Sequence, residues 1–595
     1  MFIAHLLLVG WIVPSLAQVS VPESQFKPPD PLAGAVSSNS SDSPNPQWST
    51  LLGNLLYFYE AQRSGPVSSA RIRRVDWRND SALDDGKDAG VDLSGGYYDA
   101  GDYIKTTFPL SFTLMSICWG ALDFGRGYDL SNQTAYLDDM LRWGLDWLMK
   151  AHPSNDTLFV QVADSRRDND YWGGDSGIPL PRPVYQINST SPGTDAAAMT
   201  SAAFSACSAL YANRTFSSTS FTPPASLTNS SYAELLLSHA QALHHFALDS
   251  SQQVYQIAVP AVSDAYASSS YKDDLVLASL WLSWALGGDS ELYANASSMF
   301  SKFSLSEGLG GNDGDKVFNW DEKTPGLPVL FAQVAPSVNK DSVSSWQSQA
   351  ERYFDRIVGG KSRAYLTGGG LLFFDGDSDS ASLNPALNTA MLLSRYAQIA
   401  SSSEKKKSYL DFAQNQVDYV MGKNPMSAPY VVGVNPNSPQ NPHSAPSSGG
   451  SDLNKIDTLP PLGESAHTLF GAVVGGPTKG GQFHDIRSDW PQTEVALDYN
   501  APLLTLAAMH VIGSSVVAAD ASQGAPDPYY TRLQPGEYEK AKPTGTPCDA
   551  VFPCKKRVSR VVIIVLAVVL TVVGLAIALL CWYYVRTVRA RSKTG

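Results

Sequence analysis

Residues 136–150 read YLDDMLRWGLDWLMK, the clearest helical periodicity in the chain. Leu137, Leu141, Leu145 and Leu148 recur at spacings of three or four, so they fall on one face of an α-helix. Most of the polar residues between them fall on the opposite face. The stretch therefore predicts an amphipathic helix with one face in a core.

The same spacing recurs along most of the chain. Strand-like alternation is scarce, and long Gly/Pro/Ser-rich loops such as 427–459 separate the periodic runs. We predict one large all-α domain over residues 48–520, and this many helices fit a helical barrel or toroid with functional loops at one end. Periodicity predicts the helices but does not by itself specify a barrel. The expected helices occupy residues 111–124, 195–211, 232–248, 273–286, 346–357, 387–399, 409–420 and 502–519.

The first residues carry a candidate export signal. An apolar run at 2–13 is too short to cross a bilayer, and a small-x-small pattern follows at 15–17. We therefore predict a cleaved secretory signal over 1–17. Residues 18–47 are rich in Pro, Ser and Asn and predict a disordered lead.

A second apolar run, residues 561–581, contains no charge over 21 residues. At about 1.5 Å per residue it would extend about 31 Å, close to the roughly 30 Å hydrocarbon core of a bilayer. Aromatic residues and a basic tail follow, so we predict a stalk at 521–560, a transmembrane helix at 561–584 and a cytoplasmic tail at 585–595. The alternative is a glycolipid-anchor signal, although such signals usually end within the apolar run. We expect a single-pass cell-surface protein of the secretory pathway with its domain outside.

Sequons and cysteines fit a secretory product. Cys548 and Cys554 bracket a short loop and could pair, whereas Cys118 and Cys207 lie in apolar helical patterns and are predicted to be buried thiols. Cys581 falls at the inner membrane edge. Candidate glycosylation sites occur at Asn39, Asn79, Asn132, Asn155, Asn188, Asn213, Asn229 and Asn295.

Charge is unevenly distributed. Eight of the 43 basic residues lie from Lys555 onward, where there is no Asp or Glu, so the preceding chain has 35 basic and 56 acidic residues. Its net charge of about −21 argues against a nucleic acid or another anionic polymer as partner. A neutral polysaccharide is compatible with this charge.

Two carboxylates three residues apart lie in a glycine-rich segment, GGYYDAGD, at residues 95–102. Glycines let the backbone approach a ligand closely. Asp99 and Asp102 could both accept hydrogens from one water, align it and take a proton from it. The alternative is that they cap a helix, since Asp is a favoured N-cap residue.

Glu494 begins a second candidate segment, EVALDYN, at residues 494–500. A glutamate beside apolar and aromatic groups can have a raised pKa, as a general acid at neutral pH requires. The alternative is an ordinary glutamate in the first turn of a helix. Asp485 and Arg487 lie nearby and could form an ion-pair brace with Asp489 or belong to a surface charge cluster.

Aromatic residues in loops could stack on the apolar faces of sugars. Trp172 and Trp320 lie in loop-like contexts, and His443 lies in the longest loop, where a lone histidine is commonly an incidental surface residue. Tryptophans at helical spacings are predicted to be core residues, namely Trp143, Trp147, Trp281 and Trp284.

Taken together, these segments resemble glycoside hydrolase family 9, the inverting β-glucanases that include many endoglucanases. The resemblance runs in the family's order over residues 55–506. Its motifs are EAQRSG at 60–65, Trp77-Arg78 with Ser81, VDLSGGYYDAGD at 91–102, Gln161-Val162 with Asp164, Arg182 with Tyr185, PGTD at 192–195, Trp320-Asp321 with Lys323, Asn424-Pro425 with YVVG at 430–433, NPH at 441–443, and EVALDYN at 494–500.

The resemblance implies an (α/α)6 barrel with a cleft at one end. It makes Asp102 the expected catalytic base, Asp99 its partner in holding the water, and Glu494 the general acid. It places six residues as substrate-binding candidates, namely His443, Trp172, Trp320, Tyr499, Asp485 and Arg487. It implies no cofactor. Some relatives bind structural calcium, but no compact oxygen-ligand motif in this chain assigns a site.

The chain departs from the family pattern at three places. Asn169 stands where the family usually has His, Ser444 and Ala445 stand where it usually has His and Arg, and Thr493 stands where Asn is common. We expect a monomeric endoglucanase that hydrolyses β-1,4-glucosidic bonds of cellulose or a related β-glucan with inversion. The alternatives are a non-catalytic β-glucan-binding surface protein, or a hydrolase of mixed-linkage glucan, xyloglucan or a glucosamine-containing oligosaccharide.

Overall fold

A computed structural model describes residues 18–30, 46–216, 223–310, 314–458, 466–513, 549, 551–552 and 560–591. The chain forms two compact units, Met1–Val551 and Phe552–Gly595. The predicted signal at 1–17, most of the stalk, Asn39, Cys548 and Cys554 lie outside the described residues.

The core of the first unit is a ring of inner helices. They are apolar or small on nearly every side, so each can be buried all round. α2, for example, reads TFPLSFTLMSICWGALD and is buried at every residue. The inner helices are α2 (Thr107–Asp123), α6 (Thr194–Tyr211), α9 (Lys272–Ala285), α11 (Leu327–Val338), α13 (Leu383–Ala397) and α17 (Leu497–Ile512).

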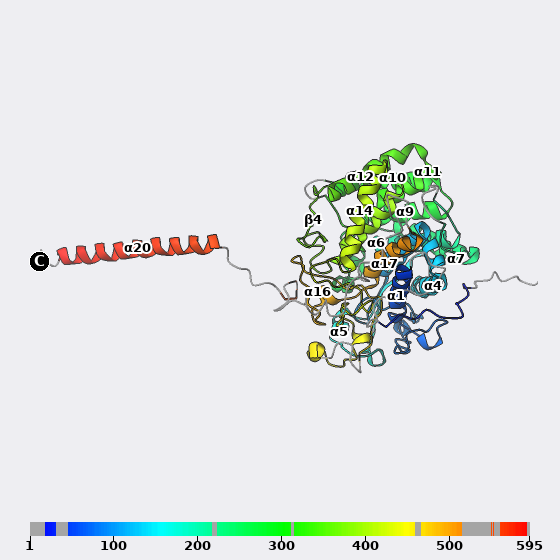
Figure 1. Cartoon of the computed structure of the whole chain (residues 1–595), viewed down its shortest axis with the longest axis horizontal. Helices are drawn as coiled ribbons and strands as arrows, with labels where there is room; N and C mark the ends of the chain where they lie inside the picture. The colour runs from blue at the N-terminus through cyan, green and yellow to red at the C-terminus, as the bar shows by residue number, and fades with distance from the viewer. Residues whose placement is uncertain are drawn as a thin grey trace, which may run out of the picture. The chain divides into compact units, whose positions relative to one another are not determined.

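A second layer of helices covers this ring. Each outer helix packs on the inner helix that precedes it around the ring: α4 on α2, α7 on α6, α10 on α9, α12 on α11, α14 on α13 and α1 on α17. Inner and outer helices alternate along the chain, which is the (α/α)6 barrel that the resemblance implies (Figure 1). The outer helices are α1 (Pro46–Ala61), α4 (Thr134–Ala151), α7 (Ser230–Asp249), α10 (Ser290–Lys302), α12 (Val343–Val358) and α14 (Ser403–Val420).

The short helices α5 and α16 lie in the loop-rich part of the domain (Figure 1). β1 pairs antiparallel with β2, and β2 with β3, so that Lys105 lies opposite Val162. This register sets the loop before β1 beside α5. The short elements are α3 (Arg126–Leu130), α5 (Ser165–Asn169), α8 (Tyr255–Ala258), α15 (Ala445–Ser448), α16 (Trp490–Thr493), β1 (Lys105–Thr106), β2 (Thr157–Val162), β3 (Val184–Asn188), β4 (Tyr365–Leu366) and β5 (Leu372–Phe373).

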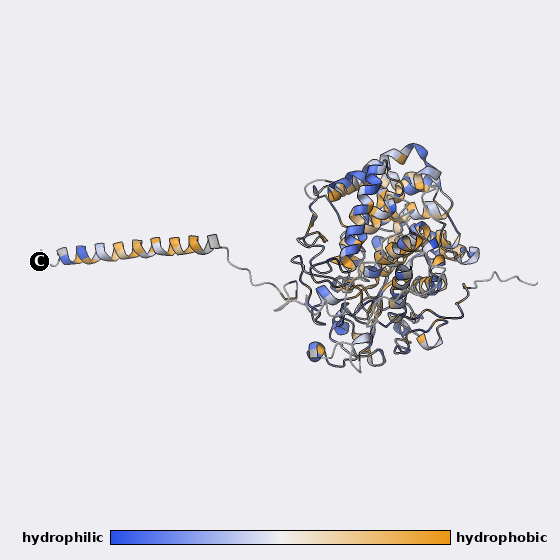
Figure 2. Cartoon of the chain, viewed as in Figure 1, coloured by the Kyte–Doolittle hydropathy of each residue, from blue (hydrophilic) through white to orange (hydrophobic). Residues whose placement is uncertain are grey.

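The second unit contains one long helix, α20 (Arg560–Arg591). Within the described part of the chain, Ile564–Arg589 is the stretch long and apolar enough to cross a membrane. Figure 2 shows orange apolar residues along most of this helix, whereas the outer helices α12 and α14 show blue hydrophilic faces. The apolar C-terminal helix predicted from the sequence is therefore present.

Cys118 and Cys207 form a disulfide, with 5.1 Å between their Cα atoms. The predicted burial of both cysteines is confirmed, but the prediction that they are free thiols is wrong. An apolar helical pattern reports that a residue is buried but not which neighbouring helix it faces. Here the two cysteines lie on α2 and α6, which pack side by side.

The start of the predicted disordered lead is packed against the domain. The Val19 amide donates to Asp138 Oδ2 (2.8 Å), and the Phe26 amide donates to the Tyr136 hydroxyl (2.7 Å). The expectation of disorder is therefore wrong for residues 18–30. A few apolar side chains in a Pro-rich segment suffice when the domain offers a surface to receive them.

Candidate active site

A cavity of about 540 Å³ lies in the loop-rich part of the domain. It brings together the three carboxylates singled out from two distant segments, Asp99, Asp102 and Glu494. Three further carboxylates that line the same cavity, Asp168, Asp264 and Asp498, were not predicted. Its other lining residues include Asn169, Tyr171, Trp172, Tyr266, Trp320, His443, Leu453, Trp490 and Tyr499.

The Asp99 loop is held between two parts of the chain. The Asp99 amide donates to the Ile104 carbonyl (3.0 Å), and the Asp99 carbonyl accepts from the Leu497 amide (3.1 Å). Asp99 is not a helix cap: its carboxylate accepts from Thr106 Oγ1 (2.9 Å) and from the Tyr266 hydroxyl. The helix-capping alternative is therefore wrong for Asp99.

The environment of Asp99 raises its pKa to about 6. Burial is the largest cause, and the hydrogen bonds from Tyr266 and Thr106 oppose it because they stabilise the charged form. Asp99 is therefore mostly charged at neutral pH, as a group that accepts hydrogens from a bound water must be.

Glu494 lies between α16 and α17 with extended backbone, so the first-turn-of-a-helix alternative is wrong. Its carbonyl accepts from the Gly475 amide (2.9 Å), and its side chain accepts from the Gly101 amide. Burial, followed by the charges of Asp99 and Asp498, raises the pKa of Glu494 to about 8. A carboxyl group with this pKa carries a proton at neutral pH.

Asp102 is half-buried in the cavity wall. Burial raises its pKa well above the usual range, and the neighbouring carboxylates Asp168, Glu494 and Asp99 raise it further. Like charges close together favour the protonated form of one of them. These carboxyl groups therefore titrate as a coupled set.

His443 joins the two catalytic candidate segments. Its amide donates to the Thr493 carbonyl (2.9 Å), and its ring lies 5.0 Å from that of Trp172. Nδ1 lies 2.6 Å from the Arg487 carbonyl, and because a carbonyl only accepts, Nδ1 carries the proton. Burial lowers the pKa of His443, so the ring is neutral at neutral pH and Nε2 is an acceptor.

The aromatic candidates line the same cavity. Trp172 is buried in its wall, and Trp320 lies edge-on to Tyr266 with ring centroids 4.8 Å apart. Tyr499 follows Glu494 and is half-buried there. All three stand where a sugar chain beside the carboxylates could contact them.

Asp485 and Arg487 do not line this cavity, contrary to the expectation that they bind substrate. Both are buried. Asp485 accepts from the amides of Gln440 (2.8 Å) and Asn441 (2.9 Å), and the Arg487 carbonyl receives the His443 ring. Their contacts support the loop that carries His443.

Sequence reasoning missed Tyr266, Asp168 and Asp498. Tyr266 lies in an irregular stretch 167 residues from Asp99, and nothing in the local pattern marks it. Asp168 belongs to a five-residue helix that reads as a polar turn. Asp498 lies within the candidate segment at 494–500, so its position beside Glu494 is the one sequence feature that could have marked it as a site residue.

Within the described ranges, no three His, Cys, Asp or Glu side chains are grouped to hold a metal ion. Structural calcium, suggested by the family resemblance, stays a prediction without an assigned site.

Sequence comparison with known proteins shows the family of this chain. The model of glycosyl hydrolase family 9 matches residues 48–507. Endoglucanase A of Bacillus pumilus is 34% identical over 454 residues, covering 76% of this chain and 64% of that protein. Endoglucanase 14 of Arabidopsis thaliana is 33% identical over 493 residues, covering 79% and 93%. The chain spans only 42% and 66% of two further bacterial relatives, from Cellulomonas fimi and Bacillus sp. strain KSM-522.

Solved structures agree with this placement. An endoglucanase from the termite Nasutitermes takasagoensis superimposes with a TM-score of 0.67 at 32% identity, covering 78% of this chain and 98% of that one. The cellulase Cel9M of C. cellulolyticum in complex with cellobiose gives 0.66 at 28% identity, covering 78% and 98%. The chain belongs to glycosyl hydrolase family 9.

Proposed function

We propose that the protein hydrolyses β-1,4-glucosidic bonds within a β-glucan chain, with inversion at the anomeric carbon. The observation that carries the proposal is the meeting of Asp99, Asp102 and Glu494 in one aromatic-lined cavity. Inverting glycosidases need a protonated acid on one side of the bond and a base holding a water on the other.

Glu494 is the proposed general acid. Its raised pKa, about 8, keeps a proton available at neutral pH. It delivers this proton to the glycosidic oxygen as the bond from that oxygen to the anomeric carbon breaks. The leaving sugar departs as a neutral alcohol, and Glu494 is left charged.

Asp102 is the proposed general base, and Asp99 helps it to hold the attacking water. The water oxygen bonds to the anomeric carbon from the face opposite the leaving group, while Asp102 takes one of its protons. Room for this water requires the acid and base carboxyl groups to lie about 6.5–9.5 Å apart.

Aromatic contacts support a glucan as substrate. Trp172, Trp320 and Tyr499 offer ring surfaces for the apolar faces of glucose units, and His443 Nε2 offers an acceptor for a sugar hydroxyl. Cellobiose bound to the related Cel9M also supports this class of substrate.

The test follows the anomer of the first product from a soluble β-1,4-glucan by NMR. The α-anomer should appear first, and Glu494→Gln should lower kcat by about 10²–10⁴-fold. Glu291→Gln, an exposed glutamate on α10, is the matched control and should keep full activity. First release of the β-anomer, or full activity of Glu494→Gln, would contradict the mechanism. Glucan binding without any release of reducing ends would favour a non-catalytic binding protein.

We also propose that the enzyme is a glycosylated, membrane-tethered protein of the cell surface. The apolar α20 supports the tether. Asn79, Asn132, Asn155, Asn213 and Asn295 are exposed on the domain, which suits attached glycans. Asn188 and Asn229 are half-buried and already accept hydrogen bonds from neighbouring residues.

A further inference from the structure

Asp168 stands behind Asp102, held by the loop that carries Asp102. Its helix, α5, begins after Asp164, whose side chain accepts from the Arg167 amide (3.1 Å). Asp168 is buried, with 3% of its surface exposed. Its Oδ2 accepts from the Tyr103 amide (2.8 Å), and the Ile104 amide also donates to it.

The side chains of Asp168 and Asp102 are hydrogen-bonded to each other. Two carboxylates can share a hydrogen bond only when one of them carries a proton. The pair therefore holds one proton in the substrate-free enzyme. Where this proton resides depends on which carboxyl group has the better partners for its charged form.

The partners of the pair favour charge on Asp168 and the proton on Asp102. Asp168 receives two backbone N–H groups and the field of Arg182, which all stabilise its anion. Asp102 faces the carboxylates of Asp168, Glu494 and Asp99, which all destabilise its anion. Burial raises the pKa of both groups.

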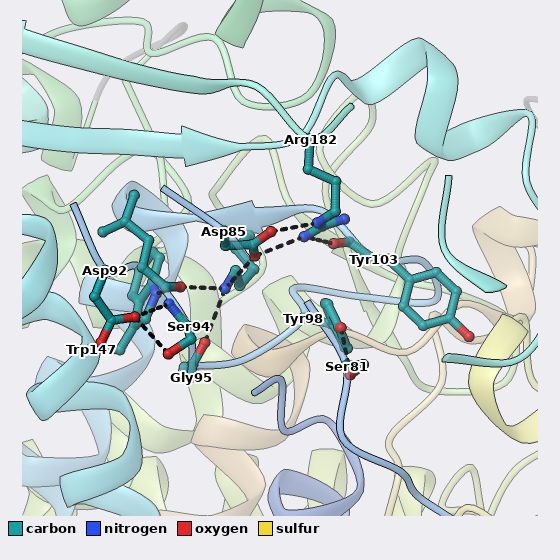
Figure 3. Close-up of polar contacts among 12 residues, drawn as sticks. Ser81, Asp85, Asp92, Ser94, Gly95, Tyr98, Tyr103, Trp147 and Arg182 are labelled. Carbon is teal, nitrogen blue, oxygen red and sulfur yellow. Dashed lines mark hydrogen bonds and ion pairs between the residues drawn. The ribbon is translucent and has the colours of Figure 1, made fainter. Parts of the chain in front are cut away.

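Arg182 is fixed in place by a buried ionic cluster (Figure 3). Its Nε donates to Asp85 Oδ1 (2.8 Å), and its Nη2 donates to the Tyr103 carbonyl (3.0 Å). Asp85 also binds Lys105 Nζ (2.6 Å), which donates to the Leu93 carbonyl (2.7 Å). The cluster thus braces Tyr103, whose amide holds Asp168, and places a guanidinium beside the pair.

We propose that Asp168 is the positioning residue of the base: it holds the loop of Asp102 through the Tyr103 amide, and through the proton that it shares with Asp102 it sets the pH above which Asp102 can take a proton from the attacking water. This inference rests on the proposed function, because it assumes that Asp102 is the base. The charge of Asp168 raises the pKa of Asp102 and so makes it a stronger base. The shared proton must leave before Asp102 can act, so the acidic limb of the pH profile lies higher than for an isolated aspartate.

The experiment compares kcat/KM against pH for the full chain and for Asp168→Asn, since this ratio reports ionisations of the free enzyme. Removing the charge of Asp168 should move the acidic limb down by about one pH unit or more. The plateau kcat should fall about 10- to 100-fold, because a neutral Asn side chain accepts less strongly from the Tyr103 amide and so holds the loop of Asp102 less firmly. Asp168→Glu keeps the charge, so its acidic limb should stay near that of the wild type.

Asp164→Asn is the matched control, because it removes a carboxylate from the start of the same short helix and leaves the pair intact. Its acidic limb should coincide with that of the wild type. Loss of activity in Asp168→Asn with an unmoved limb, or the same shifted limb in Asp168→Glu, would overturn the proposal. A wild-type chain that hydrolyses no β-glucan would instead contradict the proposed function. Thermal unfolding of each variant shows whether it is folded. If Asp168→Asn is not folded, the position of the acidic limb in Asp168→Glu tests the proposal instead.

Discussion

At the scale of the residue, the charge of Asp498 helps to set the pH up to which Glu494 stays protonated. Asp498 is buried, accepts from Asn384 Nδ2 (3.0 Å), and raises the pKa of Glu494 by its charge. Burial, together with the charge of Asp99, raises the pKa of Asp498 itself to about 7, so it is mostly charged at pH 8.

Asp498→Asn should therefore lower the pKa of Glu494 and move the basic limb of kcat/KM to lower pH, by up to about one unit. The sign follows from the acid role: activity is lost as pH rises through the pKa of Glu494. Asp264→Asn, an exposed carboxylate at the cavity rim, should leave the limb unchanged because water screens it. An unmoved or raised basic limb in Asp498→Asn would contradict this account.

Gly101 is a second residue on which the site depends. A Cβ at this position would lie 2.2 Å from the His443 carbonyl oxygen and 2.9 Å from its ring carbon Cδ2. The Gly101 carbonyl also accepts from the Ala445 amide (2.7 Å). Only a glycine lets the two loops approach this closely.

Gly101→Ala should separate these loops, lower kcat at least about 10-fold and destabilise the domain by about 1–3 kcal/mol. Gly174→Ala is the control, because a Cβ there meets nothing within 4 Å. Thermal unfolding and glucan hydrolysis measure both variants. Equal activity of the two would show that the close contact is dispensable.

At the scale of the element, inner helices α2 and α6 are joined by a bond as well as by packing. Cys118 and Cys207 are 89 residues apart in the chain, so their disulfide closes a long loop in the unfolded state. Closing such a loop restricts the unfolded chain more than the folded one.

Cys118→Ala/Cys207→Ala should lower the free energy of unfolding by roughly 2–5 kcal/mol, measured by denaturant titration. Cys581→Ala, which changes a free cysteine on α20, should not alter the stability of the domain. Free thiols located at Cys118 and Cys207 by alkylation and peptide mapping of the denatured, unreduced ectodomain would contradict the pairing.

At the scale of the whole molecule, the domain and α20 are separate compact units. A chain ending at Val551 keeps every cavity residue and lacks the apolar helix. It should be soluble without detergent and should retain the kcat/KM of the full chain. The full chain should sediment with membranes and need detergent for extraction. Sedimentation of the truncated chain with membranes, or its inactivity, would contradict this division.

The sequence by itself determined the helical character of the domain and the apolar C-terminal helix, and through the family resemblance it singled out the three carboxylates that meet in the cavity. Apolar residues at spacings of three or four must leave water together, so helices such as the one at 136–150 can be recognised locally. The local patterns around Asp99, Asp102 and Glu494 also fit a helix cap or a first helical turn, and the order of the family's motifs is what singled these residues out.

Only the tertiary structure decided which distant residues meet these groups. The hydroxyl of Tyr266 on Asp99, Asp168 behind Asp102, and the pairing of Cys118 with Cys207 all join segments far apart in the chain. The same holds for Asp485, whose charge marks it as a ligand candidate but whose partners are loop amides. The pKa of each carboxyl group depends on such neighbours and on burial, and both are set when the barrel closes.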